Sequence, residues 1–132
     1  MDTSTTPVDN SVYRERLQQA KRVIEGLPEH QREKLFDIAV FAVESEWGTI
    51  ACIAGHCGLD PWFQELGFFT DTRGTFGEVS ISPGEFFGTE IPFYAKYYQS
   101  GKSATTEDAL RALDRAIASF ANGPSTSEEV PQ

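Results

Sequence analysis

Apolar side chains recur with helical spacing near the start of the chain. Tyr13, Leu17, Ala20, Ile24 and Leu27 follow one another at steps of four, three, four and three residues. Steps of this size place side chains on one face of an α-helix. The pattern therefore predicts an amphipathic helix over residues 11–27.

The same spacing returns near the other end of the chain, at Leu110, Leu113, Ile117 and Phe120. The preceding Thr-Thr-Glu-Asp run offers a helix cap and an acidic first turn, and an Asn-Gly-Pro run follows the last apolar position. We therefore expect two amphipathic helices that bracket the chain and pack together or flank a common core.

The segment after the first helix is densely apolar. Pro28 suits the first position of a helix, and the apolar residues of 35–43 predict a second helix that is buried on most of its circumference. The β-branched and aromatic residues of 38–43 also suit a buried strand, so the pattern leaves this alternative open.

Residues 49–58 predict a short helix at the centre of the molecule. Along it, Ala51 and Gly55 form one row of small residues, and Ala54 and Gly58 form another. Small residues allow a second helix to approach closely, which makes this the expected buried central helix.

Turn signals divide the following segment into short elements. Asp60 before Pro61 is a good helix cap and predicts a short helix that ends at Gly67. Alternation of apolar and polar residues around a Gly-containing turn predicts a small β-hairpin over residues 68–81. Two further helical turns are expected over residues 82–88 and 91–98.

Length and composition fit these elements into one domain. The chain has 132 residues, of which 39% are hydrophobic and 23% charged, a balance typical of a globular protein. We predict a mainly α, compact single domain of about five to seven helices with one small hairpin. The domain should span residues 11–122, because the polar stretches at 1–10 and 123–132 have the composition of disordered tails.

Charge argues against one class of function. The formal net charge is -9, whereas proteins that grip nucleic acid directly concentrate Lys and Arg. No Lys or Arg occurs between Lys34 and Arg73, an interval that holds six acids: Asp37, Glu44, Glu46, Asp60, Glu65 and Asp71. These acids form either a solvated face or a docking surface for a basic partner.

The outward carboxylates of this interval are expected to be Glu44, Glu46 and Glu65, because each adjoins the end of a predicted element. A partner that itself binds nucleic acid could meet this surface in place of DNA or RNA. A second candidate surface is aromatic: Tyr94, Tyr97 and Tyr98 suit a protein contact, whereas the neighbouring Phe side chains suit the core.

One cluster offers candidate chemistry. Cys52, His56 and Cys57 are three of only four Cys and His residues in the chain, and Cys52 and His56 would share a helix face. They could contribute to a metal site or a nucleophilic pair. However, the spacings of zinc modules are absent, and the apolar neighbours predict buried, inert thiols. We therefore assign no catalytic residue, cofactor or metal, and treat Cys52 and His56 as weak metal candidates only.

Several strings in the middle of the chain resemble known sequences. GTIACIAGH (48–56) is followed by DPWFQELGF (60–68), EFFG (85–88) and PFY (92–94). This set resembles a group of small, uncharacterised bacterial and phage proteins with a Gly-Thr-Val/Ile-Ala-Cys-Ile-Ala-Gly-His core. Several members carry Cys before the first Gly, where this chain has Trp47. The resemblance covers residues 35–100 and implies no activity.

The start of the chain has neither the basic region nor the apolar stretch of a signal peptide, and no apolar run reaches the ~18 residues of a membrane span. We therefore expect a cytoplasmic protein with free thiols. The expected function is that of a small non-enzymatic accessory protein that binds another protein, with a phage or mobile-element origin and an anti-defence or regulatory role. The alternative is a metal-binding or thiol-dependent enzyme centred on Cys52 and His56.

Overall fold

The computed structural model describes residues 10–46, 48–71, 77–99 and 101–121. The α-helices are α1 (Asn10–Glu25), α2 (Arg32–Leu35), α3 (Ile53–Gly58), α4 (Pro61–Glu65), α5 (Pro83–Phe87) and α6 (Thr106–Ala121). Two antiparallel hairpins pair β1 (Val43–Ser45) with β2 (Gly48–Ile50) and β3 (Thr70–Asp71) with β4 (Glu78–Val79). Four 3-10 turns are η2 (Glu29–Gln31), η3 (Ile91–Phe93), η4 (Ala95–Tyr97) and η5 (Gly101–Ser103). The predicted mainly α single domain is confirmed.

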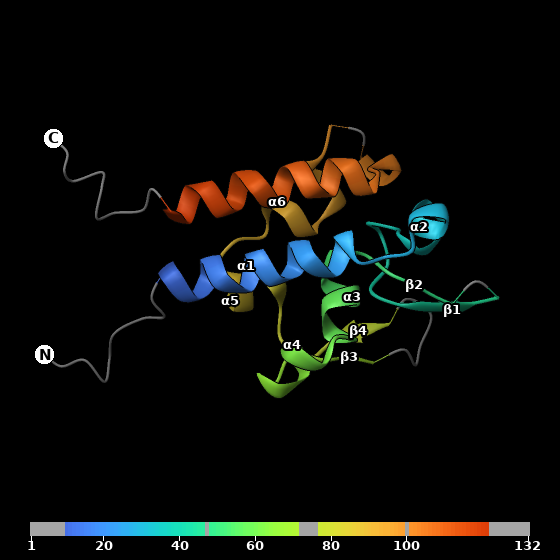
Figure 1. Ribbon diagram of the computed structural model, residues 1–132, viewed down its shortest axis with the longest axis horizontal. Helices are drawn as coiled ribbons and strands as arrows, with labels where there is room; N and C mark the ends of the chain where they lie inside the picture. Colours follow the sequence, from blue (N-terminus) through green and yellow to red (C-terminus); the bar gives the residue numbers. More distant parts are fainter. Residues whose placement is uncertain (1–9, 47, 72–76, 100, 122–132) are drawn as a thin grey trace, which may run out of the picture.

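The two long helices pack side by side in opposite directions, as Figure 1 shows. The Tyr13 ring of α1 lies 5.4 Å from the Phe120 ring of α6, and further along the pair Lys21 Nζ lies 2.8 Å from Asp114 Oδ1. Both amphipathic helices predicted from the spacing are therefore confirmed. The predicted tails lie outside the described residues, apart from Asn10, the first residue of α1.

The second predicted helix is wrong beyond Leu35. The chain leaves α2 at Phe36 in an extended conformation and runs beside residue 51: Ala51 N donates to Leu35 O at 3.0 Å, and Asp37 N donates to Ala51 O at 3.0 Å. Further on, β1 pairs with β2, with Val43 opposite Ile50. Hydrogen bonds to distant backbone therefore decide this segment, whose β-branched residues suit extended structure.

The central helix is shorter than predicted, because residues 48–50 form β2 and α3 begins at Ile53. Its glycines do lie against other chain segments. A methyl group at Gly55 would stand 2.7 Å from the Phe41 carbonyl carbon, and one at Gly58 would stand 2.6 Å from Thr70 N. The predicted close packing is therefore correct, but the neighbours are the loop backbone at Phe41 and strand β3 instead of a helix.

The elements of the following segment match the sequence pattern closely. The Asp60 side chain caps α4 by accepting from Trp62 N at 3.1 Å, and Pro61 occupies the first turn. The β3–β4 hairpin lies within the predicted span, although its turn at residues 72–76 is outside the described residues. Helix α5 occupies the predicted 82–88 segment, and residues 91–98 form the 3-10 turns η3 and η4 in place of one helical turn.

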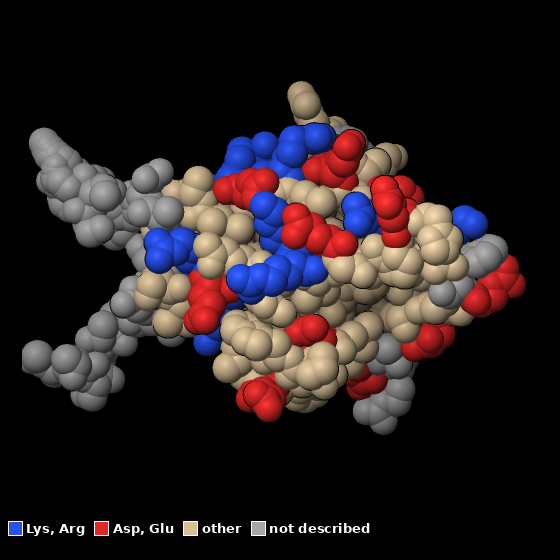
Figure 2. Space-filling model, in the orientation of Figure 1, with Lys and Arg blue, Asp and Glu red and all other residues tan. Residues whose placement is uncertain are grey.

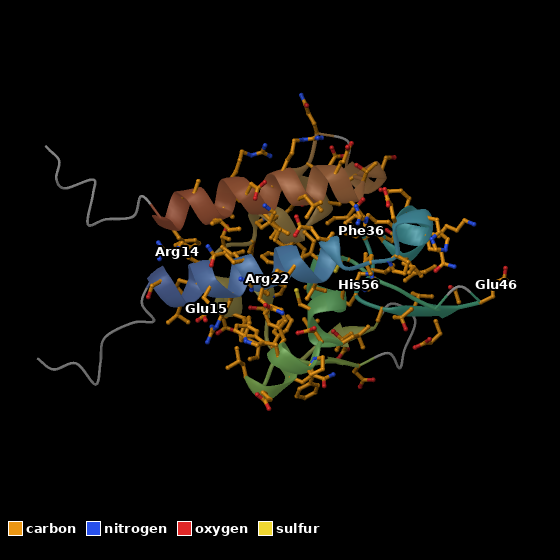
Figure 3. All side chains as sticks on the ribbon, viewed as in Figure 1. Arg14, Glu15, Arg22, Phe36, Glu46 and His56 are labelled. Carbon is orange, nitrogen blue, oxygen red and sulfur yellow. The ribbon has the colours of Figure 1, made fainter. Side chains whose placement is uncertain are left out.

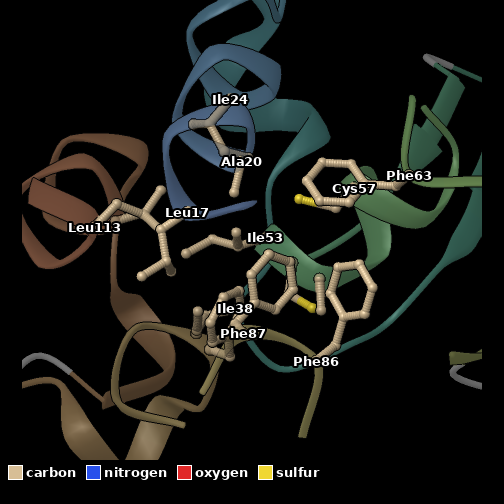
Figure 4. Packing of buried hydrophobic residues seen from close by; sticks show 14 of the residues in the cluster. Leu17, Ala20, Ile24, Ile38, Ile53, Cys57, Phe63, Phe86, Phe87 and Leu113 are labelled. Atoms are coloured by element: carbon tan, nitrogen blue, oxygen red, sulfur yellow. The ribbon is translucent and has the colours of Figure 1, made fainter. Parts of the chain in front are cut away.

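The hydrophobic core lies where α1, α3 and the aromatic side chains of α4 and α5 meet, as Figure 4 shows. Phe87 stacks on Phe93 with ring centroids 4.4 Å apart, and Phe68 stacks on Phe86 at 4.6 Å. These Phe side chains are almost completely buried, as the sequence predicted for Phe86, Phe87 and Phe93. Within the described parts of the chain, no helix is both long enough and apolar enough to span a bilayer.

Candidate functional site

The two cysteines are buried in the core as free thiols, with exposed fractions of 2% for Cys52 and 0% for Cys57. Cys52 directly precedes α3 and acts as its cap, because its Sγ accepts from Gly55 N at 3.5 Å. The side chain of Cys52 therefore has a structural partner at the start of the helix, where the sequence alone placed it inside a helix.

His56, in the same helix, contacts backbone of another segment. Its Nε2 lies 2.6 Å from the Leu35 carbonyl oxygen, and 8% of the residue is exposed. Because a carbonyl can only accept, Nε2 carries the proton in this contact. Burial lowers the pKa of His56, which favours the neutral ring. Figure 3 shows His56 beneath the segment that carries Phe36.

The acid–base properties of the thiols do not suit nucleophilic chemistry. Burial raises the pKa of Cys52 to about 11 and raises that of Cys57 well above 9.0. A thiol needs to ionise before it attacks or binds a metal. In the described ranges, no three His, Cys, Asp or Glu side chains are grouped so that they could hold a metal ion. The arrangement around Cys52 and His56 is therefore that of a packed core.

The three acidic candidates are all exposed, as predicted, but they do not form one surface. Glu44 and Glu46 belong to the β1–β2 hairpin, whose tip projects from one end of the molecule with Glu46 at its edge (Figures 1 and 3). Glu65 ends α4, on a separate part of the molecule. In the view of Figure 2, most Lys and Arg lie over α1 and α6, with Asp and Glu among them. The candidate acids Glu44, Glu46 and Glu65 belong to other elements.

The three tyrosine candidates also separate into two places. Tyr94 lines a small cleft of about 100 Å³ that reaches Cys52 and Phe93. Tyr97 and Tyr98 instead line a depression against α6. The predicted aromatic surface is therefore divided, and only Tyr97 and Tyr98 share a cavity.

A groove follows α6 beneath the segment that links α5 to η4. One cavity of about 520 Å³ is lined by Gly88, Thr89, Ile91, Ala112, Arg115, Ala116, Ser119 and Phe120. A second cavity of about 180 Å³ is lined by Ile91, Tyr97, Tyr98, Gln99, Asp108, Arg111, Ala112 and Arg115. The two cavities share Ile91, Ala112 and Arg115, and we call them together the α6 groove.

Gly88 and two tyrosine hydroxyls position the wall of the α6 groove that faces α6 and is formed by residues 88–99. Gly88 ends α5 with a φ of 78°, and a methyl group there would stand 2.7 Å from the Tyr13 ring. Only glycine fits this turn, because both the conformation and the space exclude a side chain. Beyond it, Tyr98 OH donates to Pro92 O at 2.6 Å, and Tyr97 OH donates to Glu90 Oε1 at 3.2 Å.

The groove combines exposed apolar surface with one positive charge that no described residue pairs with. Ile91 is 56% exposed and Tyr97 44% exposed. Arg111 pairs with Asp108 at 2.5 Å, whereas Arg115 has neither a hydrogen bond nor an ion pair with any residue that the structure describes. The charge of Arg115 nevertheless acts on Tyr98: burial raises the pKa of Tyr98, and Arg115 partly opposes that increase.

Sequence reasoning identified Tyr97 and Tyr98 but missed Ile91, Arg111 and Arg115. A signal for the α6 side does exist. Ala112 and Ala116 lie four residues apart, as do Arg111 and Arg115, so one face of the helix combines small and basic residues. Nothing in the local sequence marks Ile91 as exposed, because the turn after Gly88 decides its position.

No protein-family model, curated protein or solved structure matches the chain. The resemblance around residues 48–56 therefore stays a prediction. The lining and exposure of the α6 groove are therefore the basis for assigning its role.

Proposed function

We propose that the protein is a non-enzymatic accessory protein that binds another protein through the α6 groove. The observation that carries this proposal is the groove itself, where an apolar floor lies beside the 56% exposed Ile91. An exposed large aliphatic side chain over an apolar depression gains free energy when a partner covers it.

The composition of the groove supports a protein partner. Tyr and Arg are enriched in protein interfaces because each combines apolar area with a polar end. Here Tyr97 and Tyr98 stand on one wall, and Arg115 on the other. The hydrogen bonds of both tyrosine hydroxyls hold this wall in place before a partner arrives, which lowers the entropy cost of binding.

The acidic hairpin supports a second contact with the same partner. Glu44 and Glu46 are exposed on a projecting hairpin, so their field favours encounter with a basic surface. A basic, nucleic-acid-binding partner would suit this contact, which is the anti-defence form of the proposal. The groove remains the main contact, since exposed charges contribute more to the association rate than to affinity.

The experiment is capture of a partner from an extract of the native host by the full chain. A variant carrying Ile91→Ala and Tyr97→Ala should lose the captured protein. Leu66→Ala is the matched control, because Leu66 is 45% exposed on another part of the surface. Equal capture by all three proteins would contradict the proposal.

The acidic contact is tested separately with a variant carrying Glu44→Gln, Glu46→Gln and Glu65→Gln, compared with the unmodified chain from 50 to 500 mM salt. We expect weaker binding that also depends less on salt. Binding that is lost in this variant but unchanged by Ile91→Ala and Tyr97→Ala would assign the interface to the acidic residues instead.

A further inference from the structure

We infer that the α6 groove binds a peptide segment of its partner in which a carboxylate lies beside large apolar side chains. This inference rests on the proposed function and adds the chemistry of the recognised segment. The juxtaposition that carries it is the guanidinium of Arg115, which has no partner among the described residues and lines both cavities.

The charged side chains along the groove determine which sign of charge the ligand should carry. Two guanidinium groups and one carboxylate line it, and the carboxylate of Asp108 is already paired with Arg111. Glu90, which accepts the Tyr97 hydroxyl and keeps its own negative charge, is not a lining residue. Among the described lining residues the excess charge is therefore one positive charge. It lies on Arg115, whose guanidinium a carboxylate can meet with two parallel hydrogen bonds. A basic segment would place like charge against it.

The floor of the groove determines which other side chains the bound segment should carry. Ala112 and Ala116 present only methyl groups from α6, so a ligand side chain can approach the helix closely between Ile91 and Phe120. A cavity of about 520 Å³ lies within the roughly 300–1,000 Å³ range of ligand pockets, so it can hold large apolar side chains. The ligand is thus acidic and apolar, not a polyanion.

The test is selection of peptides from a random displayed library against the immobilised full chain, with the Arg115→Glu variant as the counter-selection. We expect the recovered peptides to be enriched in Asp or Glu next to Leu, Phe, Ile or Met. Recovery of peptides enriched in Lys or Arg, or of peptides without any acidic enrichment, would overturn the inference. That result would leave the proposed function standing, since the groove would still bind protein.

The recovered peptide with the highest affinity is then titrated by fluorescence anisotropy. Arg115→Glu should weaken its binding at least about tenfold, the range expected when a charge-assisted hydrogen bond is removed. Arg22→Glu is the matched control, because it makes the same charge change on α1 next to a different cavity. Equal weakening by both variants would show a general charge effect and overturn the assignment to Arg115.

The chain itself contains a segment of similar chemistry, Glu128-Glu129-Val130, which lies outside the described residues. A full-length variant carrying Glu128→Gln and Glu129→Gln distinguishes an external peptide from the chain's own segment as the occupant of the groove. Equal peptide binding by this variant and the unmodified chain supports an external partner. Peptide binding that is seen only in the variant would identify the chain's own segment as the occupant and overturn the inference.

Discussion

The centre around α3 and the α6 groove differ in how their polar groups are used. Around α3, Cys52 caps the helix and His56 meets the Leu35 carbonyl, and both residues are buried. In the groove, Arg115 has no partner among the described residues and Ile91 is half exposed. The centre holds the residue types with more reactive side chains, but the groove holds the side chains that a ligand can reach.

Residue type is therefore a weaker indicator of a functional site than polar and apolar groups that are accessible and have no partner. A buried polar group is normally hydrogen-bonded, because leaving it unpaired costs about 1–3 kcal/mol. Cysteine and histidine in a core therefore need no functional explanation. An exposed apolar side chain over a depression, with an unpaired charge beside it, has more to gain from a ligand.

The largest expected effect comes from filling the space at Gly55. Gly55→Ala would bring a methyl group 2.7 Å from the Phe41 carbonyl carbon and 2.8 Å from Ala51 Cβ, so backbone must move. We expect the free energy of unfolding to fall by at least about 3 kcal/mol in urea denaturation. Gly26→Ala is the control and should change it by less than about 1 kcal/mol. Equal stability of the two variants would show that the centre is not tightly packed.

The second prediction concerns thiol reactivity at the centre. A pKa of about 11 for Cys52 instead of 9.0 lowers the thiolate fraction at pH 8 about a hundredfold. Alkylation by iodoacetamide, followed by mass spectrometry, should therefore be at least that much slower in the native protein than in 8 M urea. Rapid alkylation of the native protein would reopen the alternative of a thiol-dependent enzyme.

The third prediction is a pH dependence caused by His56. Burial lowers the pKa of His56 in the folded state below its ordinary 6.5, so the unfolded chain binds the proton more readily. The contribution of His56 to the free energy of unfolding should therefore be fully present above pH 6.5 and be lost as the pH falls below it.

Urea denaturation between pH 5 and 8 measures this effect. His56→Gln keeps a donor for the Leu35 carbonyl but cannot be protonated, so part of the pH dependence should disappear. His30→Gln, at an exposed position in η2, should leave the dependence unchanged. If both variants follow the unmodified chain, His56 does not contribute.

The smallest expected effect is on the stability of a groove variant. Arg115→Glu breaks no hydrogen bond or ion pair among the described residues, so the free energy of unfolding should change by less than about 0.5 kcal/mol. A loss of more than about 1 kcal/mol in urea denaturation would show that Arg115 supports the fold, and the contrast between centre and groove would fail.

Much of the fold follows from the sequence where local signals are strong. The three-and-four spacing in α1 and α6, and the Asp-Pro cap of α4, give elements close to those predicted. These signals act within a few residues, so no distant contact is needed to interpret them. The burial of Phe86, Phe87 and Phe93 also followed from their apolar character, whereas Phe69 is 52% exposed.

The segment between α2 and α3 could not be assigned in the same way. Its dense apolar residues predict a buried helix and leave a buried strand over residues 38–43 as the alternative. The structure has neither there, because residues 38–39 form a turn and β1 begins at Val43. Backbone hydrogen bonds between Leu35, Asp37 and Ala51 hold the chain where it leaves α2. These partners lie about fifteen residues apart in the sequence, beyond the range of any local pattern.

By itself, the sequence determined the two long helices, the acidic charge, the free thiols and the candidate residue types. Only the tertiary structure decided which of those residues are accessible. It separated Tyr94 from Tyr97 and Tyr98, placed Glu65 apart from the hairpin, and brought Ile91 over α6. The physical reason is that periodicity fixes which face of an element is apolar, whereas the turn at Gly88 and packing against distant backbone fix what that face meets.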